Sequence, residues 1–422
     1  MPAFSIPLSG LTASSTELAT VANNLANLNT IGYKDQEVQF SDLFYENLGT
    51  DGAGDPIQQG AGAAVSSVES NFTDGNVTST GVSTDVAING NGFFVVQENG
   101  VQSFTRAGNF EIGTNNLLET TDGQEVLGYQ AVNGVVSTSA GLGPLALGAG
   151  TISPASTTSA VQITSNLSAT DSVGNSYATN VTVYDSLGAS HNITFTFTKT
   201  GTNTWTYSAS IPAADITPPA GSTLTNPVVL ATGSLTFDSN GNLLNPTSAN
   251  GSIAISTASA GALADGANAL SFNWNLYDTN GNGLLTQTAA ADSTSSVQQD
   301  GTSSGTLSTF SIGSDGTITG SFSNGKTEVL GQIALANFAD VQGLSHVGNN
   351  DYQPTLASGQ ATIGTPGTGG SGTLSGGAVE ESNVDIATEF ANLIVAQRSY
   401  EANARVVTTF DQVTQDTINI KQ

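Results

Sequence analysis

Residues suited to acid–base chemistry are few in this chain, which contains only two histidines, His191 and His346. His191 lies close in sequence to Asp185 and Ser186, and these three residue types together form the catalytic set of many hydrolases. Such enzymes often present the nucleophile on a sharp turn between a strand and a helix. The segment DSLGASH instead indicates a turn between two strands, with Gly188 at its tip. We therefore predict that the chain is not an enzyme.

Three further patterns resemble ligand sites. The segment DTNGNG, from Asp278 to Gly283, has the spacing of the first half of a calcium loop, but Ala289 occupies the position of the bidentate acid. An Asx-type hairpin turn is the better interpretation, and DSNGNL at Asp238 is a weaker version of the same pattern. The segment from Gly141 to Ala146 matches a dinucleotide motif in letters only, since it contains a proline and opens no helix. We expect no metal and no cofactor.

The composition is poor in charge. Charged residues make up 10% of the 422 residues, against about 25% in typical domains. The formal net charge is −27, and Lys199 is the only Lys or Arg between Arg106 and Lys326. Without a basic patch we expect no binding to nucleic acid, and an acidic surface is repelled by anionic lipid. The surface must consist largely of hydroxyl and amide groups.

Cysteine is absent, which excludes disulfides, thiolate metal sites and cysteine nucleophiles. The first residues, MPAFSIPLSGL, lack the basic start and the sustained apolar run of a cleaved secretory signal. No run of about 18 apolar residues is present, so we expect no membrane insertion. The chain is expected either to stay in the cytoplasm or to leave by a route that needs no cleaved signal.

The first element that the pattern predicts is an amphipathic helix over residues 5–28. Ser5 is suited to its N-cap, and Gly32 lies just past its end, where a left-handed residue is common. The opposite face is small and polar, so we expect this helix to be disordered in the monomer and to order only on packing. Its apolar stripe consists of Leu11, Leu18, Val21, Leu25 and Leu28.

A second amphipathic helix is predicted near the C-terminus. Ser382 is the expected N-cap, and Asp385 follows three residues later as a capping-box partner. Its apolar spacing drifts along the helix, as a period of 3.6 residues requires. The stripe consists of Phe390, Leu393, Ile394, Tyr400, Val407, Phe410 and Val413.

Between the helices the pattern is that of short strands and tight turns. In HNITFTFT, Ile193, Phe195 and Phe197 alternate with polar residues, and SFNWNLY does the same around Trp274. A period of two with aromatic residues indicates half-buried antiparallel strands. The turn Asn99-Gly100 after an apolar run favours a hairpin. The predicted class is mainly β with terminal helices: nested antiparallel β domains, similar to barrels or sandwiches, plus a helical pair that forms a coiled-coil-like layer in an assembly.

The chain divides by composition into four nested parts. Residues 1–35 and 378–422 form the terminal helical domain, and 36–70 with 366–377 form Gly-rich connectors. Residues 71–146 and 296–365 resemble each other in style and form one inner β domain. Residues 147–295 are expected to be an outer β domain inserted into it.

The two stripes need a covering. Pairing of the helices with each other inside one core is the ordinary explanation. Both helices, however, follow or precede a Gly-rich connector, and a two-helix hairpin cannot cover both stripes. Burying one Leu contributes about 1.5–3 kcal/mol, so we predict packing between copies of the chain through the stripe residues.

Three segments resemble the bacterial flagellar rod and hook proteins. They are SGLTASSTELATVANNLANLNTIGYK (9–34), DVAINGNGFFVV with FTRAGNF (85–110), and the C-terminal segment 382–421. The middle of the chain is similar to the hook proteins of this family in TVYDSLGASHNITFTFTK (182–199), GSLTFDSNGNL (233–243) and GQIALANFADVQGLSHVGNNDYQPT (331–355). Residues 200–232 and 244–270 resemble no known segment, as expected of a variable outer surface.

This resemblance implies a structural subunit that polymerises with itself into a bendable helical tube, a universal joint that transmits torque from rod to filament. The implied partners are a rod protein at the proximal end, a hook cap during assembly, a hook–filament junction protein at the distal end and the flagellar type III export apparatus. The implied location is extracellular, in the hook of the flagellum, reached without a cleaved signal.

Two other functions stay open. A distal rod protein, or another axial flagellar subunit, shares the terminal segments but would be shorter and would lack the 147–295 insert. A secreted carbohydrate-binding adhesin could share the polar β body, but it would not need the terminal stripes.

Overall fold

The computed structural model describes residues 5–132, 134–148, 150–219, 221 and 223–420. Within these residues it has two α-helices, α1 (Ser5–Ala26) and α2 (Ile386–Ile420), and the rest is mainly short strands. The predicted class, mainly β with terminal helices, is confirmed. The chain forms two compact units: unit 1 comprises residues 1–150, 309–320 and 328–422, and unit 2 comprises residues 151–308 and 321–327.

Unit 1 contains both helices and most of the short strands. Its strands are β1 (Gln36–Asp42), β2 (Glu46–Thr50), β3 (Pro56–Gln59), β4 (Ala63–Ser70), β5 (Val77–Ser79), β6 (Val86–Asn89), β7 (Phe93–Glu98), β8 (Val101–Thr105), β9 (Phe110–Ile112), β10 (Leu118–Thr120), β11 (Glu125–Val132), β12 (Val135–Val136), β13 (Gly143–Pro144), β29 (Thr327–Ile333), β30 (Leu335–Asn337), β31 (Ser345–Gly348), β32 (Asp351–Gln353), β33 (Thr362–Gly364), β34 (Thr373–Gly376) and β35 (Ala378–Glu380). Three strands have residues in both units: β27 (Gly305–Ile312), β28 (Thr317–Phe322) and β29, of which only Thr327 lies in unit 2.

The main sheet of unit 1 is built around β7. Strands β29, β11, β7, β8, β32 and β31 follow one another across it. β7 and β8 form the predicted hairpin, because Asn99 and Gly100 both take positive φ and close a two-residue turn between Glu98 and Val101. Alternate residues of β7 enter two clusters: Phe94 packs on Phe110, and Phe93 packs on Tyr352.

The predicted connector 36–70 is more regular than expected. β1 pairs with β4 and β2 pairs with β3, both antiparallel, so the segment is a long ribbon with most side chains exposed. The second connector, 366–377, includes β34, which pairs with β6. Residues 378–380, expected in the terminal helical part, form β35 against β5 instead. Gly32 has the predicted left-handed conformation, with φ of 68°.

Unit 2 is formed from two five-stranded sheets and smaller pairs. One sheet has the order β22–β24–β15–β25 with β26 also on β15, and the other has the order β16–β17–β18–β20–β21. The strands of unit 2 are β14 (Ile152–Ser153), β15 (Ala160–Ser168), β16 (Ser176–Tyr184), β17 (Ser190–Gly201), β18 (Thr204–Ile211), β19 (Ile216–Thr217), β20 (Val228–Phe237), β21 (Leu243–Asn245), β22 (Ser252–Ser256), β23 (Ala262–Leu263), β24 (Ser271–Asn275), β25 (Leu285–Thr288) and β26 (Ser293–Gln299). Four short 3₁₀ turns complete the described elements: Thr138–Ala140, Ala213–Asp215, Ser248–Asn250 and Val341–Gly343.

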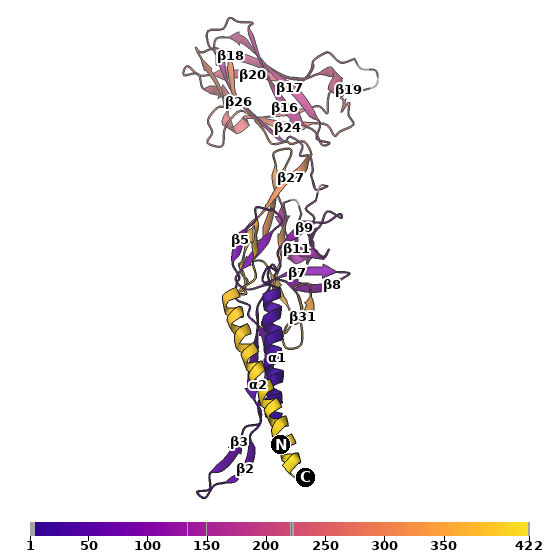
Figure 1. Ribbon diagram of the computed structural model, residues 1–422. Coiled ribbons are helices and arrows are strands. Elements are labelled where there is room, and N and C mark those ends of the chain that lie inside the picture. The colour runs from indigo at the N-terminus through magenta and orange to yellow at the C-terminus, as the bar shows by residue number, and fades with distance from the viewer. Residues whose placement is uncertain (1–4, 133, 149, 220, 222, 421–422) are drawn as a thin grey trace. The chain divides into compact units, whose positions relative to one another are not determined.

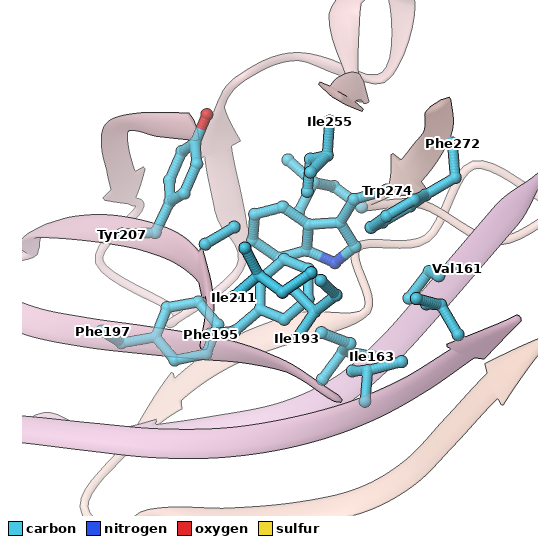
Figure 2. Close-up of a cluster of buried hydrophobic side chains, with 14 of the residues drawn as sticks. Val161, Ile163, Ile193, Phe195, Phe197, Tyr207, Ile211, Ile255, Phe272 and Trp274 are labelled. Atoms are coloured by element: carbon cyan, nitrogen blue, oxygen red, sulfur yellow. The ribbon is translucent and has the colours of Figure 1, made fainter. Parts of the chain in front are cut away.

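Trp274 lies at the centre of the core of unit 2 (Figure 2). Its ring packs against Phe195, with centroids 4.8 Å apart, and against Tyr207, with centroids 5.1 Å apart. The predicted alternation on β17 is confirmed, because Ile193, Phe195 and Phe197 are fully buried while the residues between them are not.

One detail of the predicted antiparallel fold is wrong. β15 pairs antiparallel with β26, but it pairs parallel with both β24 and β25. The reason is the turn from Asp278 to Gly283, between β24 and β25. It returns the chain to the end of β24, where the Leu284 N–H donates to the Leu276 carbonyl at 2.8 Å. β24 and β25 therefore continue in one direction along the same edge of β15.

Candidate assembly interface

The two terminal helices lie side by side within unit 1 (Figure 1). Their contact is made by small and polar residues: a Cβ on Gly10 would meet the Asn403 side chain at 2.9 Å, and Ala13 and Ala396 are buried. The helices thus pair with each other, which is the ordinary explanation considered above. Small residues, however, bring the two backbones close together, so the pairing leaves large side chains outside the contact.

The predicted stripe residues fall into three groups. Val21 is buried, and Leu11, Leu18, Leu25, Leu28, Leu393 and Val407 are half-buried. Five side chains on α2 are exposed, from 37% for Tyr400 and Phe410 to 59% for Ile394. The other two exposed stripe residues are Phe390 and Val413. The structure thus buries one stripe residue, covers six of them in part and leaves five of them exposed within this chain.

Sequence reasoning missed part of the uncovered surface. On α1, Ile6 and Leu8 are exposed, and on α2 the same holds for Val395 and Val406. None of these four residues belongs to the spacing that was used to find the stripes. The apolar residues of each helix cover a wider arc than one stripe, which is typical of a helix with more than one contact face. This width was the signal in the sequence that could have found them.

The N-terminus of α2 differs from the prediction. The helix begins at Ile386, and the Asp385 carboxylate accepts a hydrogen bond from the Thr388 backbone N–H at 2.8 Å. Asp385 is therefore the N-cap, and Ser382, predicted for that role, is not. These backbone hydrogen bonds lower the pKa of Asp385. Both residues are good caps, so the sequence spacing alone could not choose between them.

A buried ion cluster holds the ends of the chain together in unit 1. The Lys34 ammonium contacts the Glu380 carboxylate at 2.6 Å, and both side chains are fully buried. The Arg106 guanidinium lies 3.5 Å from the same carboxylate and 3.6 Å from that of Asp74. Burial lowers the pKa of Lys34, and the charge of Glu380 opposes that change. The cluster joins the segment that follows α1, the residue that follows β8, and β35.

The backbone around the cluster is shaped to fit it. The Lys34 ammonium also donates to the Thr73 carbonyl at 2.6 Å, and the Gly75 N–H donates to Glu380 at 2.8 Å. A Cβ on Gly32 would lie 2.6 Å from the backbone of Arg106, so only glycine fits. Sequence reasoning did not find this cluster. The signal that could have found it is the small number of cations. The chain has only seven Lys and Arg residues, and two of them are Lys34 and Arg106.

His191 is held in a second ion cluster, in unit 2. Its two ring nitrogens lie 3.1 Å from the carboxylates of Asp185 and Asp215, and Asp265 lies 3.5 Å away. Burial would lower the pKa of His191, but hydrogen bonds to Asp185 and Asp215 outweigh it and raise that pKa. When His191 is protonated, both of its N–H groups can donate to these carboxylates, and the ring then has no lone pair for a metal.

The triad arrangement considered for His191 is not formed. Ser186 Oγ accepts a hydrogen bond from the Asn268 backbone N–H, and the ring nitrogens of His191 face carboxylates. The interpretation of this segment as a turn is confirmed, because the Gly188 N–H donates to the Asp185 carbonyl and Gly188 has φ of 85°. Sequence spacing missed Asp215 and Asp265, which come from distant turns.

The calcium-like segment is an Asx turn, as predicted. Asp278 Oδ1 accepts from the backbone N–H groups of Asn280 and Asn282, at 2.9 and 2.8 Å. Hydrogen bonds from Asn282 lower the pKa of Asp278. Asp238 makes the same turn with Asn242. The carboxylate that would bind a cation is thus occupied by backbone donors.

Models of four protein regions match the chain. They are described as the flagella basal body rod protein (residues 6–34), the flagellar hook protein FlgE/F/G D1 domain (87–171), the flagellar basal body protein FlaE D2 domain (150–302) and the flagellar basal body rod FlgEFG protein C-terminal region (375–420). The two terminal matches cover the helices, and the other two cover much of the β body.

Whole-chain relatives agree with these matches. The flagellar hook protein FlgE of Escherichia coli K12 is 35% identical over 99% of this chain and 100% of its own length. The FlgE protein of Treponema pallidum is 31% identical over 98% of both chains. A crystal structure of Helicobacter pylori flagellar hook protein FlgE2 overlaps with a TM-score of 0.46 and 15% identity, over 70% of this chain and 98% of that one.

The paired terminal helices expose apolar side chains, and the ion clusters hold parts of the β body together. Both features are those of a structural subunit. The matches specify which subunit. The chain belongs to the flagellar hook protein FlgE family. It is a structural subunit of the bacterial flagellar hook and serves motility, and membership implies self-polymerisation within the hook and rod-associated assembly. No described helix is long and apolar enough to cross a lipid bilayer.

Proposed function

We propose that copies of this chain build the hook by packing their paired terminal helices against each other, with the stripe residues as the contact. The observation that carries this proposal is the exposure of large apolar side chains on a helix that already has a partner in its own chain. Phe390, Ile394 and Val413 are each about half exposed on α2. Full burial of an exposed side chain of this kind contributes about 1.5–3 kcal/mol, and covering the remaining exposed half contributes about half of that, so several of them together favour packing between copies.

The helices then form the inner wall of a tube, and the β domains form its outer part. Contacts between outer domains would be made by hydroxyl and amide groups, since only 10% of residues are charged. Such contacts are weak and easily exchanged, so neighbouring outer domains can slide while the helices hold. This division of roles would let the tube bend as it transmits torque from rod to filament.

Contacts at the two ends of the tube follow from the same helices. The terminal segments match models of rod proteins, which supports a rod protein as the proximal partner. A hook cap during assembly, a hook–filament junction protein at the distal end, and extracellular delivery by the flagellar type III export apparatus complete the proposed set. They are supported by family membership.

The test is a single added charge on the exposed face of α2. Ile394→Asp should abolish tubes seen by negative-stain electron microscopy of concentrated full-length protein, while circular dichroism stays unchanged. Gln397→Asp, which adds the same charge at an exposed polar position of the same helix, is the matched control and should still give tubes. Normal tubes from Ile394→Asp would refute the proposed contact.

A further inference from the structure

An acidic pocket lies between α1, β1 and the first turns of α2, all within unit 1. Its volume is about 720 Å³. Three structural segments supply its four carboxylates, and apolar residues form part of its wall. The carboxylates are those of Glu17, Asp35, Glu37 and Glu389, and the apolar side chains are those of Val21, Val38 and Phe40.

Two carboxylate oxygens of the pocket are buried without a partner. Glu389 is only 7% exposed, and its Oε2 accepts no hydrogen bond from the described residues. The same is true of Asp35 Oδ1. Burial raises the pKa of Glu17, Asp35 and Glu389, because water no longer solvates the charge. A buried carboxylate without a donor is costly, so the pocket is suited to a cationic donor.

The described part of this chain has few cations to offer. Lys34, Arg106 and Lys199 are buried among partners of their own, and Lys326 has interactions of its own. Arg398 pairs with Glu401 on the same helix at 3.3 Å. Arg405 is exposed and forms no ion pair with a described residue. It is thus the available described cation.

The surroundings of Arg405 match the rim of the pocket. Arg405 lines a shallow apolar groove on α2 together with Val406, Phe410 and Val413. On the pocket side, Val38 is half-buried and Phe40 is 46% exposed. Each surface therefore combines one type of charge with apolar side chains that are partly exposed in this chain, and the charges are opposite.

Arg405 cannot enter the pocket of its own chain. It lies on the same helix as Glu389, sixteen residues further along. At 1.5 Å per residue the two positions are about 24 Å apart on a straight helix, which is beyond the reach of an arginine side chain. A guanidinium that enters this pocket from α2 must come from another copy.

We propose that the acidic pocket receives Arg405 of a second copy of this chain, with its guanidinium between Glu389 and Asp35. The planar guanidinium can donate to both unpaired oxygens at once, which an ammonium does less well. Val406 of the second copy, which is 43% exposed in this chain, then covers Phe40. This inference rests on the proposed assembly through the helices and names one of its contacts.

A double-mutant cycle tests the pair. Glu389→Gln and Arg405→Gln should each raise the critical concentration for tube formation at least about tenfold, and the double variant should resemble either single variant. Arg398→Gln removes the same charge from the same helix and should change that concentration less than about twofold. Additive effects, or an equal effect of Arg398→Gln, would refute the pair. A response to Glu389→Gln alone would point to a small cation instead.

Cross-linking between introduced cysteines tests the geometry. The chain has no cysteine of its own, so only the introduced residues can react. Glu37→Cys and Arg405→Cys are made in separate full-length chains and assembled together. A short thiol-to-thiol cross-linker should join the two chains, because an extended arginine side chain holds its own Cα farther from Glu37 than the about 7 Å that a disulfide spans. Gln397→Cys in place of Arg405→Cys should not be joined. Tubes without the cross-link would overturn this inference alone. Failure of the unchanged chain to form tubes would overturn both it and the proposed assembly.

Discussion

Replacing Lys34 with methionine should selectively destabilise unit 1. The substitution keeps the length of the side chain but leaves the fully buried Glu380 carboxylate without its 2.6 Å partner. Removal of one member of a buried ion pair costs about 3–5 kcal/mol. Because Arg106 and the Gly75 N–H still contact Glu380, we expect the lower end of that range. With a urea slope of about 3 kcal/mol/M, the midpoint of unfolding falls by about 1 M.

The chain provides separate signals for its two units. Both α-helices belong to unit 1, so circular dichroism at 222 nm reports its unfolding. Both tryptophans, Trp205 and Trp274, lie in the core of unit 2, so their fluorescence reports that unit. Lys34→Met should shift the helical transition and leave the fluorescence transition in place. The unchanged fluorescence serves as an internal control within each sample.

Two variants separate the ion pair from general effects of lost charge. Arg398→Met removes an exposed arginine and should shift the helical midpoint by less than about 0.3 M. The double variant Lys34→Met with Glu380→Met should be more stable than Lys34→Met alone, because no buried carboxylate is left without its partner. A shift below about 0.3 M for Lys34→Met, or an equal shift of the fluorescence transition, would refute the reasoning.

Two further predictions concern His191 and the cap of α2. Because the pKa of His191 is raised, its protonated form stabilises unit 2 below about pH 6.5, the pKa of histidine in the unfolded chain. This stabilisation is lost as the pH rises through the pKa of the folded state. The lowered pKa of Asp185 has the opposite effect, because the stability that it contributes is lost in acid. Tryptophan-monitored stability should therefore fall as the pH rises above about 6.5, and a His191→Gln variant that falls as steeply would contradict this. Asp385→Ala should remove the cap and speed hydrogen exchange in the first turn of α2, whereas Ser382→Ala should not. Equal effects of the two variants would show that the cap is misassigned.

Local patterns allowed much of the fold to be predicted from the sequence. The alternation of Ile193, Phe195 and Phe197 and the turn Asn99-Gly100 depend on neighbours within a few residues. Periodicity therefore identified the strands and both helices. It could not choose between Ser382 and Asp385 as the cap of α2, because both side chains satisfy the same short-range requirement.

Contacts between distant residues were not predictable in the same way. Lys34 and Glu380 are separated by 346 positions, and neither residue has a local pattern that indicates the other. The parallel pairing of β15 also depends on strands more than a hundred residues away. For the assembly surface, the stripes identified the helices but not which side chains stay uncovered. That outcome depends on the close approach of α1 and α2 at Gly10 and Ala396.

The ion pair between Lys34 and Glu380 also affects the order in which the two units can complete their folding. Unit 2 draws most of its residues from one continuous stretch, 151–308, so its long-range pairs close modest loops. Unit 1 cannot complete its ion cluster until Glu380 is available. A chain that emerges with its N-terminus first therefore cannot complete the packing around Lys34 until residue 380 has appeared, and only then can the paired helices present their exposed face to a growing structure.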